Sequence, residues 1–284
     1  MQKEFAFFPG CVLTQAAIEA KMSIEAIAPI LGVTLKEIPG WSCCGASQAQ
    51  DVDPLATLVA NARNLALAEK MKLPVLTTCS TCLLMLRRSK AELDGGKKEK
   101  INTYLAKGNM NYQGTSEVTS LLWFLAQNAE EIKAKVKKPL SNLKVAVFYG
   151  CHSVRPGKDL GFESPTNPTS FETVIKALGA QVVPFSKRLD CCGFHAVYPA
   201  EKSVMKMTSG IVNSAAESKA DCVVTPCPLC QMQLDIYQDD AQATTKSKAR
   251  VPVVHLSQLV GLALGIPAKK LGLDYNVIDA SKLG

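Results

Sequence analysis

The tetrapeptide Ser42-Cys43-Cys44-Gly45 returns as Asp190-Cys191-Cys192-Gly193 in the second half of this 284-residue chain. In both halves one cysteine precedes the doublet, and a C-x-x-C pair follows it after 34 residues. The two resulting sets are Cys11, Cys43, Cys44, Cys79 and Cys82, and Cys151, Cys191, Cys192, Cys227 and Cys230. Ten of the eleven cysteines thus share one repeated pattern, which predicts two equivalent units that bind metal through thiolates.

The doublet is the unusual part of each set. Adjacent cysteines in a regular strand point to opposite faces, so two that serve one site need a kinked backbone. Gly45 and Gly193 follow the doublets and permit such a kink. A closed zinc site takes four ligands and a cubane iron–sulfur cluster takes four cysteines. Five thiols per set therefore favour a larger iron–sulfur group, and a zinc-binding assembly module is the last-ranked alternative.

The composition is that of an ordinary soluble protein, with 47% apolar and 20% charged residues, and the length allows two domains. The net charge is +7, and basic residues gather at 97–100 and 133–138 without interleaved aromatics, so nucleic-acid binding is not expected. No signal peptide is apparent, and the apolar run 259–266 is too short to span a bilayer. We therefore expect a cytoplasmic protein without a transmembrane segment, whose cysteines bind metal instead of forming disulfides.

Strands and helices are predicted to alternate in the same order in both halves, which indicates an α/β fold with mainly parallel strands. Predicted strands are 4–8, 33–38, 75–78, 144–149, 180–185, 221–225 and 251–254. Predicted helices are 15–31, 54–71, one from 83 onward, 168–178, 199–218, 229–237 and 256–264, and 116–136 reads as one amphipathic helix. The expected units are a first domain (1–95), a helical linker segment (96–142) and a second domain with a C-terminal tail (143–284).

Four of the cysteines directly follow predicted strands: Cys11, Cys79, Cys151 and Cys227. Sites in parallel sheets form at the carboxyl ends of strands. A pseudo-twofold axis would bring these ends together, so we expect the two sets to face each other across a substrate cleft between the halves. No dinucleotide or P-loop motif is present, so flavin or nicotinamide chemistry is expected to belong to a partner chain.

Five further residues are candidates because they lie near the cysteines in the sequence. His152 follows Cys151 and His195 lies three residues after Cys192, so each is a candidate to bond a cluster sulfur or donate a proton. Arg155, Lys187 and Arg188 flank the second set and are candidates for binding an anionic substrate. His255 and Cys222 receive structural interpretations, as a helix cap and as a buried apolar residue.

The sequence resembles HdrB, the cysteine-rich component of heterodisulfide reductase that is built from two CCG domains, including its sulfur-oxidation type. The resemblance rests on Phe5-Ala-Phe-Phe-Pro-Gly-Cys11, Val145-Ala-Val-Phe-Tyr-Gly-Cys151, both doublets and both C-x-x-C pairs, and covers about residues 3–265. It implies two pseudo-twofold-related CCG domains, each a small, mainly parallel sheet flanked by helices. It also implies one noncubane [4Fe–4S] cluster on each five-cysteine set.

The resemblance further implies an oxidoreductase that reduces or forms a disulfide, or handles protein-bound sulfur, within a complex. Its expected partners are a ferredoxin-like iron–sulfur protein (HdrC-like) and a flavoprotein (HdrA-like), with a disulfide or a lipoate-carrying protein as substrate. The alternative is an electron-transfer iron–sulfur component of a glycolate, lactate or succinate dehydrogenase complex. Such homologues often carry an N-terminal ferredoxin segment, which this sequence does not show, so the HdrB type is preferred.

Overall fold

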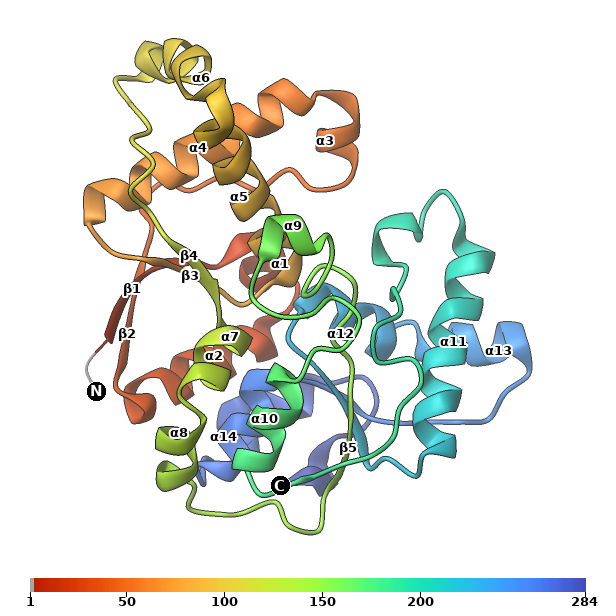
Figure 1. The fold of residues 1–284 in the computed structure, drawn as a ribbon. Coiled ribbons are helices and arrows are strands. Elements are labelled where there is room, and N and C mark those ends of the chain that lie inside the picture. The colour runs from red at the N-terminus through yellow and green to blue at the C-terminus, as the bar shows by residue number, and fades with distance from the viewer. Residues whose placement is uncertain (1–2) are drawn as a thin grey trace.

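The computed structural model describes residues 3–284 and contains one four-stranded parallel sheet in each half of the chain (Figure 1). The first sheet has the order β2-β1-β3-β4 and the second the order β6-β5-β7-β8, so the duplicated topology is confirmed. The strands are β1 (Lys3–Phe8), β2 (Val33–Glu37), β3 (Val75–Thr77), β4 (Val118–Ser120), β5 (Lys144–Val147), β6 (Gln181–Val182), β7 (Cys222–Thr225) and β8 (Val253–His255).

The two central strands of each sheet carry the cysteine-bearing turns. β1 pairs in parallel with β3, with Phe7 opposite Leu76, and β5 pairs in parallel with β7, with Ala146 opposite Val223. These strands are buried on both faces, as expected for parallel strands covered by helices. Because the strands are parallel, the turns that follow them lie at the same edge of each sheet.

The helices of the first half largely match the sequence-based prediction. They are α1 (Gly10–Gln15), α2 (Ile18–Leu31), α3 (Gln48–Val52), α4 (Pro54–Met71), α5 (Ser80–Glu92) and α6 (Lys98–Leu105). The Asp53 carboxylate caps α4 by accepting a 2.9 Å hydrogen bond from the Ala56 N–H, as expected for an acidic residue before proline. α5 begins at Ser80, so Cys82 lies inside its first turn, and the short helix α3 had not been expected.

The prediction of one helix over 116–136 was wrong. This segment forms β4, α7 (Leu121–Gln127) and α8 (Ala129–Lys135). Val75 of β3 pairs with Val118, and the Ser120 hydroxyl caps α7 by accepting a hydrogen bond from the Trp123 N–H. A strand of three residues is too short to show an alternating pattern, and it forms because β3 offers it an open edge. The expected linker segment 96–142 therefore contributes the fourth strand of the first sheet.

The helices of the second half are α9 (Gly157–Leu160), α10 (Ser170–Ala177), α11 (Glu201–Glu217), α12 (Pro228–Asp235), α13 (Gln238–Thr245) and α14 (Leu256–Ala263). The strand predicted over 180–185 is only two residues long, although the Val183 N–H still donates a 3.0 Å hydrogen bond to the Val145 carbonyl. His255 caps α14, and Cys222 is fully buried, so both structural interpretations are confirmed.

The two halves share one continuous apolar core. The hydroxyls of Ser23 on α2 and Ser257 on α14 are 2.6 Å apart and buried, and Trp123 stacks on Phe162 with ring centroids 4.6 Å apart. Figure 1 shows α3 to α6 standing at one end of the molecule and α11 and α13 at another side. Within residues 3–284 none of the helices combines the length and apolar character needed to cross a membrane.

Candidate metal centre

The first cysteine set gathers at the carboxyl edge of the first sheet. Cys11 lies in α1 just after β1, the doublet follows β2, and Cys79 is the N-cap of α5. The Sγ atoms of Cys11 and Cys43 are 3.6 Å apart, and those of Cys44 and Cys82 are also 3.6 Å apart. Five sulfurs far apart in the sequence therefore converge in one place.

The second set repeats this arrangement at the second sheet. Cys151 follows β5 and Cys227 is the N-cap of α12. The Sγ atoms of Cys151 and Cys191 are 3.8 Å apart. The first cysteine of each doublet accepts a backbone hydrogen bond, from the Gly45 N–H at 3.5 Å in the first set and from the Gly193 N–H at 3.3 Å in the second. The equivalent residues of both sets thus occupy equivalent positions.

Glycine makes room for the thiols. Gly10 has φ +75°, and a Cβ there would lie 2.9 Å from the Cys82 Sγ. Gly150 has φ +69°, and its Cβ would lie 3.0 Å from the Cys230 Sγ. Only glycine combines this left-handed backbone with such a close approach to sulfur. The glycine before each single cysteine is therefore a requirement of the thiol set.

The thiols are too crowded to ionise together. Hydrogen bonding with Cys11 and Cys44 lowers the pKa of Cys43 to about 2, whereas hydrogen bonding with Cys43 raises the pKa of Cys44 to about 12. Hydrogen bonding to Cys44 and Cys79, with burial, raises the pKa of Cys82 well above its ordinary value. Five thiolates in this space require a compensating positive charge, which a bound metal group would supply.

The donor set fits an iron–sulfur group better than a single ion. Each set offers five thiols, one more than a closed zinc site takes, so the donor set suits a group with several metal atoms. The buried hydroxyl of Thr78, next to Cys79, has no hydrogen-bond partner among the described residues. Inorganic sulfide is an acceptor that such a hydroxyl suits.

The two sets meet at the interface between the halves. The Sγ atoms of Cys79 and Cys227 are 3.9 Å apart, and both residues are buried. Beside them the hydroxyls of Ser80 and Ser153 are 2.7 Å apart. The sequence-based expectation that the sets face each other across the interface therefore agrees with this geometry.

A threonine connects the two candidate histidines. The Thr81 hydroxyl lies 2.9 Å from Nδ1 of His152 and 3.4 Å from Nε2 of His195. Burial lowers the pKa of His152, which favours its neutral form. Sequence reasoning missed Thr81, although its place inside the first C-x-x-C was a usable signal.

A cleft of about 500 Å³ opens between the halves beside these residues. Its lining from the first half is Ala46, Ser47, Gln50, Leu84, Met85 and Arg88, and from the second half Cys151, His152, Arg155 and Pro156. A smaller cavity of about 140 Å³ lies against the first cysteine set and includes Phe194, His195 and Leu229 from the second half. Ala46 and Ser47 line both spaces, so the cleft, which Cys151 lines, adjoins the cavity against the first set.

Of the three basic candidates, only Arg155 lines the cleft. Lys187 pairs with Asp190 at 2.9 Å, and Arg188 pairs with Glu172 and lies over the Tyr149 ring. The last two side chains are thus engaged elsewhere in the second half.

Arg88 is the cleft cation that sequence reasoning missed. Its Nε donates a 2.9 Å hydrogen bond to Asp159, which joins the halves at the cleft. It follows Leu84 by one helical turn of α5, and both residues line the cleft. The one sequence signal for Arg88 was its position on the helix that follows the first C-x-x-C.

The CCG family model, a cysteine-rich domain, matches residues 5–87 and 145–235. The chain is 83% identical over 284 residues to the 8-methylmenaquinol:fumarate reductase membrane anchor subunit of Wolinella succinogenes, with all of both chains covered. It is 30% identical to the B component of the ferredoxin:CoB-CoM heterodisulfide reductase of Methanosarcina mazei, with 97% of this chain and 94% of that one covered. These relatives are subunits of oxidoreductases.

A solved structure shares the fold. The crystal structure of a hypothetical protein from Helicobacter pylori superimposes with a TM-score of 0.80 at 16% identity. The match covers 98% of this chain and about half, 52%, of the other. This likeness supports the α/β architecture.

Proposed function

Because the chain belongs to the family of proteins built from the CCG cysteine-rich domain, we propose that it is an iron–sulfur subunit of a quinol:fumarate reductase. The observation that carries the proposal is the 83% identity, over the full length of both chains, to a component of such an enzyme. This reverses the order of the two sequence-based hypotheses, because it favours electron transfer over disulfide cleavage.

The ten patterned cysteines would hold two noncubane [4Fe–4S] clusters, one on each set. Such clusters accept and release electrons one at a time. The 3.9 Å separation of the Cys79 and Cys227 Sγ atoms supports a path between the sets, because electron transfer slows steeply with distance. Both sets are buried where Cys79 and Cys227 meet, which excludes water from the path.

The quinol ring would bind in the cleft between the halves. Oxidation of a quinol to a quinone releases two electrons and two protons. Leu84, Met85 and Pro156 offer apolar surface for a flat ring, and the amide of Gln50 can hydrogen-bond a ring oxygen. Neutral His152 would accept a released proton, with Thr81 between it and His195.

The electrons would pass to partner proteins that reduce fumarate to succinate with two electrons and two protons. The expected partners remain a flavoprotein and a ferredoxin-like iron–sulfur protein, since the chain has no nucleotide-binding motif. The proposed location is the cytoplasmic face of a membrane, reached through surface contacts by a chain that has no membrane-spanning helix within residues 3–284.

The test uses the whole complex with Cys43→Ser in this chain. We expect quinol-driven fumarate reduction to fall at least a hundredfold, because one cluster site loses a ligand, whereas fumarate reduction driven by a reduced viologen dye stays near wild type. Cys222→Ala is the matched control, because Cys222 lies outside both sets. Full quinol-driven activity in a Cys43→Ser complex that has lost iron would overturn the proposal.

Disulfide reduction is the second candidate, supported by the 30% identity to a heterodisulfide reductase component and by the completeness of both sets. In this role two electrons and two protons would convert a disulfide into two thiols at the same cleft. Turnover of a mixed disulfide by the dye-reduced complex, together with no quinol oxidation, would favour this function over the first.

A further inference from the structure

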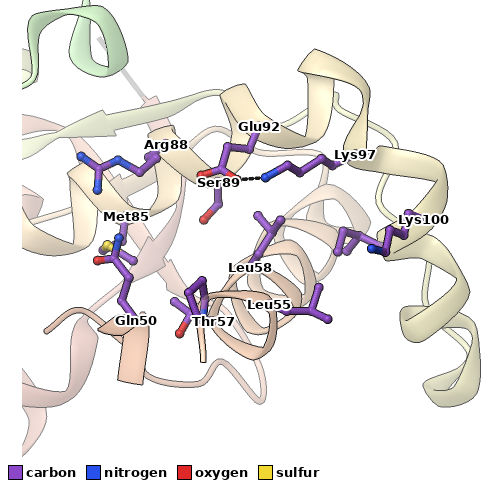
Figure 2. Close-up of a pocket in the computed structure, with 12 residues that line it drawn as sticks. Gln50, Leu55, Thr57, Leu58, Met85, Arg88, Ser89, Glu92, Lys97 and Lys100 are labelled. Atoms are coloured by element: carbon purple, nitrogen blue, oxygen red, sulfur yellow. Dashed lines mark hydrogen bonds and ion pairs between the residues drawn. The ribbon is translucent and has the colours of Figure 1, made fainter. Parts of the chain in front are cut away.

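A second apolar space leads away from the cleft and plays no part in the site described so far. This space, named the arm groove, has a volume of about 400 Å³ and lies among α3, α4, α5 and α6. Its lining is Gln50, Pro54, Leu55, Thr57, Leu58, Met85, Arg88, Ser89, Glu92, Lys97, Lys100 and Ile101. Figure 2 shows Leu55 and Leu58 on one wall, opposite Ser89 and Glu92.

The arm groove adjoins the cleft. Gln50, Met85 and Arg88 line both spaces. In Figure 2 these three residues lie at one end of the groove and Lys100 lies at the other. A ligand longer than the cleft would therefore reach the end of the groove that Gln50, Met85 and Arg88 mark.

The charged groups of the groove lie at its edge or are already paired: Arg88, at the junction with the cleft, pairs with Asp159 at 2.9 Å. Lys97 pairs with Glu92 at 2.6 Å, and its side chain is half exposed. Leu58, Met85 and Ile101 are buried residues of the wall. The lining thus offers an apolar interior and a basic edge, and an uncharged hydrocarbon chain fits the interior without burying a charge.

The equivalent helices of the second half pack differently from those around the arm groove. α11 corresponds to α4 because both follow the doublet, and α13 corresponds to α6 because both precede the fourth strand. α11 and α13 close on a small apolar core of Val197, Val204, Met205 and Ala241. The second half therefore packs apolar side chains between α11 and α13, where the first half has the arm groove between α4 and α6.

The mouth of the groove is suited to a membrane surface. Leu55 is 40% exposed at the mouth, and Val52, two residues before Pro54, is 84% exposed. Lys97 and Lys100 line the same groove as Leu55. Exposed apolar side chains next to lysines are typical of surfaces that contact acidic lipid headgroups.

We propose that the arm groove binds the isoprenoid chain of the quinol whose ring occupies the cleft. The proposal rests on the proposed function, and it adds the place of the tail and the direction from which the quinol enters. A quinol drawn from the membrane would slide its ring past Leu55 toward Met85, and its tail would remain between α4 and α6. The groove would recognise the tail through apolar contact. The affinity for a quinol should therefore depend on the length of its tail.

The test compares two substrates in the intact complex: menaquinol with its isoprenoid tail, and a naphthoquinol without a tail. Leu55→Gln should raise the KM for the tailed quinol about tenfold, because it removes one buried apolar contact, and leave the KM for the tailless quinol unchanged. Met207→Gln on α11 is the matched control, since Met207 is 38% exposed and lies outside both spaces. It should change neither KM.

A binding readout separates tail contact from effects on catalysis. A menaquinone with a photoreactive diazirine on its tail should crosslink to peptides from α4 and α6, and unlabelled tailed menaquinone should compete. Equal KM changes for both quinols, or crosslinks confined to other elements, would overturn the tail site. If the wild-type complex oxidises neither quinol, the proposed function itself fails.

Discussion

At the residue scale, two glycines determine whether the sulfurs of each set can converge. Gly10 and Gly150 adopt left-handed backbone conformations directly before the single cysteines. In both places a Cβ atom would reach the sulfur of the last cysteine in the same set. A non-glycine residue at either position would strain the left-handed backbone, and its Cβ would also collide with the sulfur. Both effects would disturb the cysteine set, because neither the backbone nor the sulfur can move away freely.

Gly10→Ala should therefore remove the first metal group and spare the second, and Gly150→Ala should do the reverse. We expect each variant to retain about half of the wild-type iron and acid-labile sulfide, because each set lies within one half. Gly210→Ala is the control, since a Cβ there meets no atom within 4 Å and alanine favours a helix. Full iron content in both the Gly10→Ala and Gly150→Ala variants would contradict this account.

At the scale of elements, α12 connects a cysteine set to the C-terminal segment. α12 begins at the second C-x-x-C and ends at Asp235, which is 4% exposed. The Asp235 carboxylate accepts hydrogen bonds from the Val277 and Ile278 N–H groups at 2.7 and 3.0 Å. Burial raises the pKa of Asp235 to about 6, so the folded protein binds this proton more tightly than the unfolded chain does.

Asp235 should make the protein more stable in mild acid. Its contribution is fully present below about pH 4 and is lost as the pH rises through about 6, with a slope of up to about 1.4 kcal/mol per pH unit. Asp235→Asn imitates the protonated carboxyl, so the difference in unfolding free energy between variant and wild type should depend on pH in this window. Urea unfolding between pH 4 and 7 measures it, and a constant difference would contradict the assignment.

At the scale of the whole molecule, the packing of two repeated halves against each other creates one cleft that both halves line. Neither half alone encloses the cleft, since its lining comes from both. The contacts nearest the cysteines are Cys79 with Cys227, Ser80 with Ser153, and Thr81 with both histidines. Next to the cysteines, the C-x-x-C of the first half therefore makes the contacts with the second half, whereas elsewhere in the interface α2 packs against α14.

The proximity of the two sets predicts magnetic coupling between their clusters. Cys191→Ser should cost the second cluster and leave most of the first, and Cys43→Ser should do the opposite. In a state where both clusters are paramagnetic, the wild-type EPR spectrum should show splitting or broadening that is absent from either variant. A wild-type spectrum equal to the sum of the two variant spectra would refute close contact, and loss of all iron in one variant would indicate a single shared site.

The sequence by itself determined the duplicated α/β order, both cysteine sets, the glycines beside them and the caps at Asp53 and His255. These features are local, because a cap or a turn depends on neighbours within a few residues, and the repeat shows each of them twice. The same local signals favoured the disulfide hypothesis. The relationship to a fumarate reductase component comes instead from the identity over the whole chain.

Only the tertiary structure decided which side chains meet. Thr81 reaches His152 across 71 positions of sequence, and Arg188 turns to Glu172 instead of the cleft. The strand β4 exists because β3 pairs with it, and the arm groove exists because α6 does not close on α4 as α13 closes on α11. Each of these depends on contacts between segments far apart in the chain, whose geometry no local pattern encodes.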